Sequence, residues 1–442
     1  MNSVLARPFR AVKNFRHSIA YLPSQLALLY LILGLAVVVP SIENDALPDM
    51  LNWLKFKDPE TARALLSTLI AGMVSLMVFS FSMVMTVLSQ AGGNFSHKLV
   101  FGLITERHHQ RVLGHYLGTI LFILILLIVP LKGETPSLWR SMGAYLGVTM
   151  VVHCLGLFVY FIHNASQSVQ INAITEGLHR ETRQALEHLE SQQRSSRWRY
   201  MDPLPAIGAS CHPIHSQRSG YIQNVDLEAV AEIAESQDAV VHINFSFGDY
   251  TVENFPLFKV EAPEEPDDAW CQKLLAQLVY VQGETVKDLY VNGLTQLMEI
   301  AIKALSPGIN DPGTARLCLH QITELLIRRL KLLPSNVLAD DQGHIRVTWP
   351  IRSFETLLYR LFMPILHYGR EDISILLALL KALKTLSLYA RHQELEVIQA
   401  HANQVVERLY QIARDRLDHQ FINERLSSGE HRLQLPATLK IR

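Results

Sequence analysis

The stretch LLSTLIAGMVSLMVFSFSMVMTVLSQ, from Leu65 to Gln90, decides the fold of this chain. It lies within a run from Ala64 to His97 that contains no Asp, Glu, Lys or Arg. As an α-helix rising about 1.5 Å per residue, it would be about 39 Å long, enough to cross the roughly 30 Å hydrocarbon core of a bilayer. The stretch therefore predicts a membrane-spanning helix.

Hydroxyl side chains recur along one edge of this predicted helix. Thr68, Ser75, Ser82 and Ser89 follow one another at seven-residue spacing, and Thr86 lies near them. A seven-residue repeat keeps side chains on one edge of a helix, and we expect that edge to face protein or water and not lipid. Two interpretations stay open: the hydroxyls pack helices together, or they line a polar pathway in an oligomer.

Three other segments are apolar enough to cross a bilayer, and none of them carries Asp, Glu, Lys or Arg in its core. Together with the first stretch they predict four spans, at about residues 20–40, 65–90, 112–131 and 142–163. The third and fourth spans contain the pairs Gly114-x-x-x-Gly118 and Gly143-x-x-x-Gly147. This spacing lets helix backbones approach closely, so it indicates tight packing between spans.

The charges outside the spans predict their orientation. Residues 1–16 carry Arg and Lys but no acid, and the segment 91–111 is net basic, whereas the segment 41–64 is net acidic. Because basic segments stay on the cytosolic side, both termini are expected in the cytosol. The predicted partner of the spans is the lipid bilayer.

The composition excludes several classes of function. The net charge is -1, and the 4 cysteines form no paired motif. No basic stripe with interleaved aromatic residues is present, so no nucleic-acid partner is predicted. The chain contains no P-loop, nucleophile elbow or zinc-protease motif, so we expect no enzyme activity, no cofactor and no metal site.

The rest of the chain predicts an α+β region on the cytosolic side. After a membrane domain at 1–165, we expect the fourth span to continue as one helix to about Glu190. The predicted fold class is an α-helical membrane domain followed by a cytosolic α+β domain with a small β-rich subdomain and a helical C-terminal region. The boundaries are a helical stalk at 166–200, the β-rich subdomain at 201–262, the helical domain at 268–425 and a tail at 426–442.

Short β-branched and aromatic runs predict the strands, and 3.6-residue periodicity predicts the helices. The strands are expected in GYIQNV (220–225), VVHINFSF (240–247), YTVENFPLFKV (250–260) and HIRVTW (344–349), with a helical insert from Asp226. The helices are expected at about 268–282, 290–305, 312–332, 353–363, 372–390 and 393–417.

Polar residues inside or beside the spans are candidates for function. His153 lies near the middle of the fourth span, and an ionisable group at that depth is a functional candidate by default. The alternative is a neutral imidazole that bonds a neighbouring hydroxyl; in either case we expect His153 to face the second span. Gln90 and Asn94 add polar groups at the end of the second span.

The sequence ALSPGINDPGTA, from Ala304 to Ala315, is the chemically richest part of the cytosolic region. Asp311 is a good N-cap, and Pro312 suits the first turn of the helix that follows. Such a loop can receive an anion on free N–H groups or a cation on side-chain oxygens, or it can be a rigid turn. The candidate residues are Ser306, Pro307, Gly308, Asn310, Asp311 and Pro312.

Several blocks of this sequence resemble the bacterial membrane-protein family called domain of unknown function 2254. The resemblance implies a multi-span inner-membrane protein with a cytosolic C-terminal region, and it brings no activity with it. Two departures are His97, where the family tends to have Pro, and Gly313, where an aromatic residue is usual. The blocks are FSFSMVM (79–85), NFSHKL (94–99), VLGHYLGT (112–119), FIHNASQSVQ (161–170), SGYIQNVD (219–226), GDYTVENFPLFKV (248–260) and ALSPGINDPGTA (304–315).

Two functional hypotheses follow from the sequence. The first is a homo-oligomeric, channel-like or transporter-like protein in which the second span lines a pathway for a small ion and the cytosolic domain regulates it. The second is a non-conducting membrane anchor whose cytosolic domain binds a small ligand or a protein partner, with the loop at 304–315 as its site.

Overall fold

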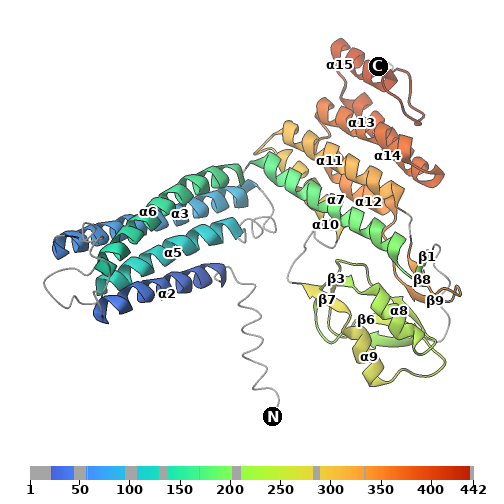
Figure 1. Cartoon of the computed structure of the whole chain (residues 1–442). Helices are drawn as coiled ribbons and strands as arrows, with labels where there is room; N and C mark the ends of the chain where they lie inside the picture. Colours follow the sequence, from blue (N-terminus) through green and yellow to red (C-terminus); the bar gives the residue numbers. More distant parts are fainter. Residues whose placement is uncertain are drawn as a thin grey trace. The chain divides into compact units, whose positions relative to one another are not determined.

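The computed structural model divides the chain into two compact units, Met1–Ala173 and Ile174–Arg442. Figure 1 shows a bundle of long helices in the first unit, and strands with further helices in the second. The residues described in the structure are 21–43, 56, 58–94, 107–128, 138–168, 170–201, 211–281, 289–332 and 335–438.

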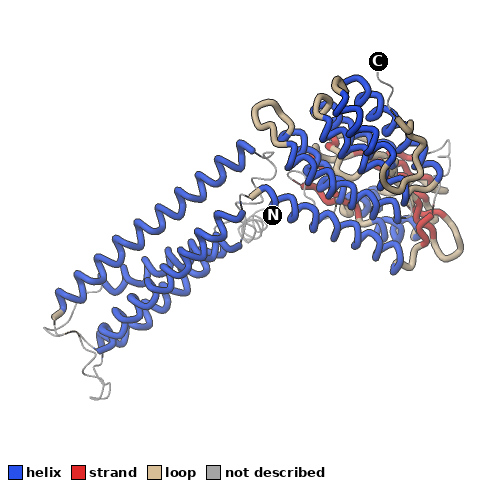
Figure 2. The backbone as a smooth tube through the Cα atoms, turned by 90° about the horizontal axis from the view of Figure 1, so that it is seen from above, coloured by secondary structure: helices blue, strands red, loops and turns tan. Residues whose placement is uncertain are grey.

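The first unit contains four long apolar helices that run side by side (Figures 1 and 2). Each is long and apolar enough to cross a bilayer, which confirms four candidate spans. Helix α3 is longer than the predicted span because Asp58 caps it: the backbone N–H groups of Glu60 and Thr61 donate to its carboxylate. The helices are α2 (Tyr21–Glu43), α3 (Pro59–Asn94), α5 (Arg107–Ile128) and α6 (Leu138–Ser168).

Glycines set the closest approach in this bundle, as the paired-glycine pattern predicted. A Cβ atom at Gly114 would lie 2.7 Å from Leu26 Cδ1, and one at Gly118 would lie 2.7 Å from Tyr30 Cγ. Both distances are too short for a real contact, so only glycine lets α5 pack against α2 at this separation. Gly143 does the same for α6, because a Cβ there would lie 2.8 Å from Val37 Cγ1.

The predicted continuous helix after the fourth span is wrong. Helix α6 ends at Ser168, Gln170 is not helical, and a separate helix, α7 (Ile171–Ser195), begins afterwards. The end of α6 is rich in Asn, Ser and Gln. Asn and Ser are weaker helix formers than Ala or Leu, so this composition favours the end of a helix.

Two sheets form the β part of the second unit. The larger sheet has the strand order β1-β8-β9-β4-β6-β2. Among its described strand pairs, only β4–β9 is parallel. Its strands are β1 (Arg199–Met201), β2 (His212–His215), β4 (Val240–Ile243), β6 (Pro256–Glu261), β8 (Val337–Ala339) and β9 (Ile345–Thr348). The smaller antiparallel sheet has the order β5-β3-β7, from β5 (Tyr250–Thr251), β3 (Gly220–Val225) and β7 (Leu278–Val281).

The sheets differ from the prediction in where their strands come from. Strands were expected within 220–260 and at 344–349, but the sheets also recruit β1, β2, β7 and β8. Strand β7 replaces the end of a predicted helix at 268–282: α9 (Asp268–Leu275) stops early, and the run LVYV then pairs with β3. Its β-branched and aromatic residues suit a strand, and pairing with a distant segment decides the outcome.

Helices complete the second unit. Helix α8 (Leu227–Glu235) is the predicted insert after Asp226. The segment 393–417, predicted as one helix, contains two, because the backbone of Ala413 is extended at the end of the first helix. The remaining helices are α10 (Tyr290–Ala304), α11 (Pro312–Lys331), α12 (Phe354–Tyr368), α13 (Ile373–Tyr389), α14 (His392–Ile412) and α15 (Arg416–Ser427).

Candidate functional site

The hydroxyl edge of α3 lies on the outer surface of the bundle. Thr68, Ser75, Ser82, Thr86 and Ser89 are all exposed in the single chain. Three of these hydroxyls donate to a carbonyl of their own helix: Thr68 to Ala64 O (2.9 Å), Ser75 to Ala71 O (3.0 Å) and Thr86 to Ser82 O (3.0 Å). Only a second molecule or water can keep this edge from lipid.

The surface beside these hydroxyls is open. A Cβ atom at Gly72 would have nothing within 4 Å, in contrast to the glycines of α5. Phe79 and Phe81 are also exposed, at 57 % and 55 %. For Gln90 and Asn94 the structure describes only the helical backbone of the last turns of α3. The second span therefore packs in the bundle through its other face.

His153 is exposed in the single chain, and its described ring contact is with the third span, whereas the prediction expected it to face the second. Its ring stands edge-on to His115 of α5, with 5.3 Å between centroids. His115 Nδ1 shares a hydrogen bond of 2.7 Å with the Tyr30 hydroxyl. Next to this pair, Thr119 Oγ1 and Cys154 Sγ are 3.3 Å apart in the bundle interior. These contacts join α2, α5 and α6 as interhelical polar packing.

The loop at 304–315 forms a tight exposed turn between α10 and α11. Ser306 Oγ donates to Lys303 O, and the Asn310 N–H donates to Ser306 O. Asn310 has a φ of +50°, a left-handed conformation that Asn tolerates. Pro307, Gly308 and Asn310 are exposed, while Pro312 occupies the first turn of α11.

Asp311 caps α11 with both of its carboxylate oxygens. Oδ1 accepts from the Thr314 N–H at 3.1 Å, and Oδ2 accepts from the Thr314 hydroxyl at 2.6 Å. The hydrogen bond from the Thr314 side chain, together with that from its backbone, lowers the pKa of Asp311. Because its own helix uses the carboxylate, the geometry matches the rigid-turn interpretation of this loop.

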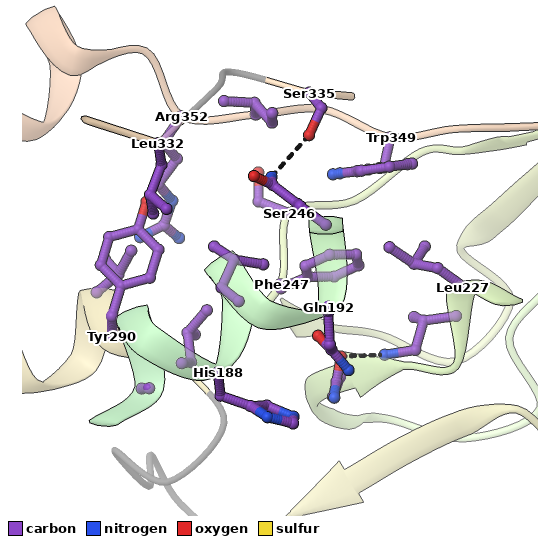
Figure 3. A pocket seen from close by; sticks show the side chains of 18 of the residues that line it. His188, Gln192, Leu227, Ser246, Phe247, Tyr290, Leu332, Ser335, Trp349 and Arg352 are labelled. Atoms are coloured by element: carbon purple, nitrogen blue, oxygen red, sulfur yellow. Dashed lines mark hydrogen bonds between the residues drawn. The ribbon is translucent and has the colours of Figure 1, made fainter. Parts of the chain in front are cut away.

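The second unit contains a cavity of about 550 Å³. This volume lies in the range of small-molecule sites, about 300–1,000 Å³. Figure 3 shows Tyr290, Leu332 and Arg352 on one side of it and Leu227 and Trp349 on the other. The wall is built from the C-terminal half of α7, the first residues of α8 and α10, the end of α11, and the segments that follow β4 and β9.

One buried cation lines this cavity. Arg329, in the last turn of α11, is only 8 % exposed. Its Nε donates to the Tyr290 hydroxyl at 2.9 Å, and among the described residues no carboxylate lies within ion-pair distance of it. Burying a charge without a counter-charge is costly, so Arg329 is the most unusual group in the wall.

The other charged groups of the wall already have partners or lie near solvent. Arg352 donates to Asp249 Oδ1 at 2.8 Å, and the second oxygen of Asp249 accepts from the Ser246 N–H. Asp226 is exposed and caps α8 by accepting from Ala229 N. Glu228 is half-buried, so Arg329 is the buried charge in the described wall that lacks a counter-charge.

Sequence reasoning missed this cavity. Arg329 belongs to the run RRLK at the end of a predicted helix, where basic residues normally stabilise the C-terminal dipole. The cavity wall comes from segments as far apart in the sequence as Ala185 and Arg352, so no local motif marks the cavity. The only signal in the sequence was the absence of a nearby acid at the position of Arg329.

The sequence matches the family described as "Predicted membrane protein (DUF2254)" over residues 16–385. The match covers all four candidate spans and the complete cavity wall. The chain belongs to this family. Membership agrees with the four apolar helices and confirms the resemblance inferred from the sequence blocks.

Relatives of this DUF2254 member include uncharacterized proteins of Mycobacterium bovis and Mycobacterium tuberculosis. Each is 26 % identical over 341 residues, which is 74 % of this chain and 64 % of the relative. The chain thus spans less than two thirds of the length of these relatives. No solved structure matches the chain.

Proposed function

We propose that this membrane protein is a receptor whose second unit binds a small soluble ligand in the cavity lined by Arg329. One observation carries the proposal: a cavity of ligand size has a buried guanidinium in its wall with no counter-charge. A bound ligand is the simplest source of the missing partner, and convergent polar groups in an apolar pocket are typical of binding sites.

The proposed receptor sits in the inner membrane with both termini in the cytosol, as the charges around the spans indicate. Helix α7 carries the response, because it contributes His188, Gln192 and Gln193 to the cavity and follows α6 directly along the chain. Gln193 Nε2 donates to Ser335 Oγ at 2.8 Å. A ligand that changes this contact would act on the helix that follows the spans along the chain.

Ligand-induced stabilisation of the purified full-length chain tests the proposal. A ligand at about 100 times its Kd stabilises the folded state by about 2.7 kcal/mol, which raises the unfolding midpoint by several degrees. We expect at least one compound of a soluble-metabolite library to do so. Gln192→Trp at the cavity should remove the shift, while Gln217→Trp at an exposed position outside it should keep it. A shift that survives Gln192→Trp, or a library without any stabilising compound, would contradict the receptor proposal.

A second function is supported by the exposed edge of α3. In this proposal the hydroxyls of several copies surround a common axis, so the protein is a homo-oligomer that conducts a small ion. The open space beside Gly72 and the exposure of Ser75 and Ser82 support it. Rings of hydroxyls can replace water around a permeating ion.

Flux through liposomes distinguishes this second function. Ser75→Leu should reduce flux at least tenfold, because it places an apolar side chain in the pathway. Thr149→Leu is the matched control: Thr149 is an exposed hydroxyl on α6 that also donates to its own helix, at Tyr145 O. Equal flux in the wild type and in both variants would exclude a pathway along α3.

A further inference from the structure

We propose that the ligand of this cavity is a small organic anion that carries an aromatic ring, with its anionic group held between Arg329 and the N-terminus of α10. The inference rests on the proposed receptor function and adds the chemical class of the ligand. Two independent features of the wall, Arg329 and the N-terminus of α10, favour an anionic group at the same end of the ligand. Aromatic side chains elsewhere in the wall favour an aromatic ring in the rest of the ligand.

The first feature is the start of helix α10. This helix has 15 residues, and its N-cap residue, Leu289, offers no side-chain hydrogen bond. The Asn292 N–H donates to Leu289 O, while the N–H groups before it have no acceptor inside the helix, and the helix dipole favours a negative charge beside them. Leu289, Tyr290 and Val291 all line the cavity, so this positive end belongs to its wall.

The second feature is the guanidinium of Arg329. Its Nε is held by the Tyr290 hydroxyl at 2.9 Å, which ties Arg329 to the first residue of α10. This bond uses one donor and leaves the terminal NH groups for another acceptor. A guanidinium binds a carboxylate or a phosphate in a two-pronged geometry. Both groups carry the charge that the α10 N-terminus also favours, which is why we choose an anion.

Aromatic side chains form the middle and far parts of the wall. Figure 3 shows Phe247 between Tyr290 and Trp349. The Trp349 ring is held edge-on to Tyr200, which also lines the cavity, and Phe247 is held edge-on to Phe245. Rings fixed in this way offer a preformed surface against which a flat ligand can stack.

The side opposite Tyr290 is acidic. Figure 3 shows Leu227 across the cavity from Tyr290, and Asp226 and Glu228, which flank Leu227 in the sequence, also line the cavity. Their carboxylates accept hydrogen bonds from hydroxyl or amino groups and repel an anion. The wall is therefore polarised, and it orients a ligand with its anionic group toward α10 and its donor groups toward α8.

Two chemical sources fit this description, a nucleoside monophosphate and an aryl carboxylate. Titration of the full-length chain with two matched pairs, AMP with adenosine and 2-naphthoate with 2-naphthamide, separates them. In at least one pair the anion should bind at least tenfold more tightly than its neutral partner. Arg329→Met should remove that difference, whereas Arg414→Met, at an exposed arginine outside the cavity, should keep it.

A second pair of variants tests the α10 end at Leu289, a buried residue of the wall, and both variants remove the same leucine side chain. Leu289→Asp and Leu289→Asn introduce side chains of nearly the same size, and both supply an N-cap oxygen to α10. Only Asp also brings a negative charge to the proposed anion position. We expect Leu289→Asp to weaken anion binding at least tenfold and Leu289→Asn to change it less than threefold.

The outcomes separate ligand class from receptor function. If the neutral and anionic members bind equally, or if Arg329→Met and Leu289→Asp leave anion binding unchanged, the anionic class is wrong while a cavity receptor stands. The absence of binding by all four compounds also overturns the anionic aromatic class. Binding of an anion that Gln192→Trp does not affect places the site elsewhere and overturns the receptor proposal itself.

Discussion

At the scale of single residues, the second unit contains a buried lysine that joins the end of one helix to the middle of another. Lys384 of α13 is 6 % exposed. Its Nζ donates to three backbone carbonyls at the end of α15, Arg425 O, Leu426 O and Ser428 O, at 2.7–2.9 Å. These carbonyls are among those that a helix C-terminus leaves without internal partners. Burial lowers the pKa of Lys384.

Lys384→Met should therefore destabilise the second unit by about 2–4 kcal/mol, because buried carbonyls lose their donors. Lys381→Met is the matched control, since Lys381 is exposed on the same helix. Thermal unfolding of the full-length chain measures the difference. Equal midpoints for the two variants would show that water satisfies these carbonyls.

Ionisation of Asp311 makes the stability of the fold depend on pH. Its folded pKa is lowered by the hydrogen bonds from Thr314, so its stabilising contribution is complete above the unfolded value of about 3.9. The contribution is lost as the pH falls through the folded pKa. Asp311→Ala should cost about 1 kcal/mol at pH 7 as a lost N-cap, whereas Asp341→Ala at an exposed site should cost less.

The variant Asp311→Asn isolates the charge. Asn caps a helix about as well as Asp but does not titrate, so the variant should lose less stability than the wild type between pH 5 and pH 2. Unfolding midpoints across this range check the prediction. Parallel pH profiles for the two proteins would mean that Asp311 is not ionised in its cap.

Residues that act locally were predictable, and residues that act across the fold were not. The capping role of Asp311 follows from its place before Pro312, so the sequence was sufficient. Arg329 and Lys384 are similar basic residues in helical sequence, and nothing local separates them from exposed ones. Their roles depend on burial by segments that lie far away along the chain.

At the scale of elements, glycine position decides which faces of the spans meet. Gly118 is buried on α5 against Tyr30, while Gly72 lies on the open edge of α3. The paired-glycine spacing predicted the first contact correctly. The small residues of α3 did not show which face of this helix the other spans would cover, because packing within the bundle decides which face is covered.

Gly118→Ala should destabilise the bundle by about 1–3 kcal/mol, because its Cβ would overlap the Tyr30 ring unless α2 moves. Gly72→Ala should have no destabilising effect, because its Cβ meets open space. Resistance of the purified protein to heat or to denaturing detergent compares the two. Equal loss in both variants would mean that the α3 edge is as tightly packed as the α5–α2 contact.

Elements of the second unit were predictable where their pattern is local. Helices α10, α11 and α13 begin and end within a residue or so of the predicted positions, since caps and turns mark them. Strands β1, β2, β7 and β8 were missed because each is only 3 or 4 residues long. Such short strands are defined by their partners in the sheet.

At the scale of the whole molecule, the chain combines four candidate spans with a unit that contains a ligand-sized cavity. The sequence predicted the spans and the mixed second region, because hydropathy and periodicity are properties of contiguous residues. It did not predict the cavity, which forms only when the ends of several elements converge. The functional emphasis therefore moves from the loop at 304–315 to the wall around Arg329.

An experimental structure of the full-length protein, purified from its native membrane with the proposed anionic ligand added, tests the central claim most directly. The account predicts non-protein density inside the cavity, in contact with the Arg329 guanidinium and with the first N–H groups of α10. An empty cavity whose Arg329 side chain turns to a carboxylate of the chain would contradict it.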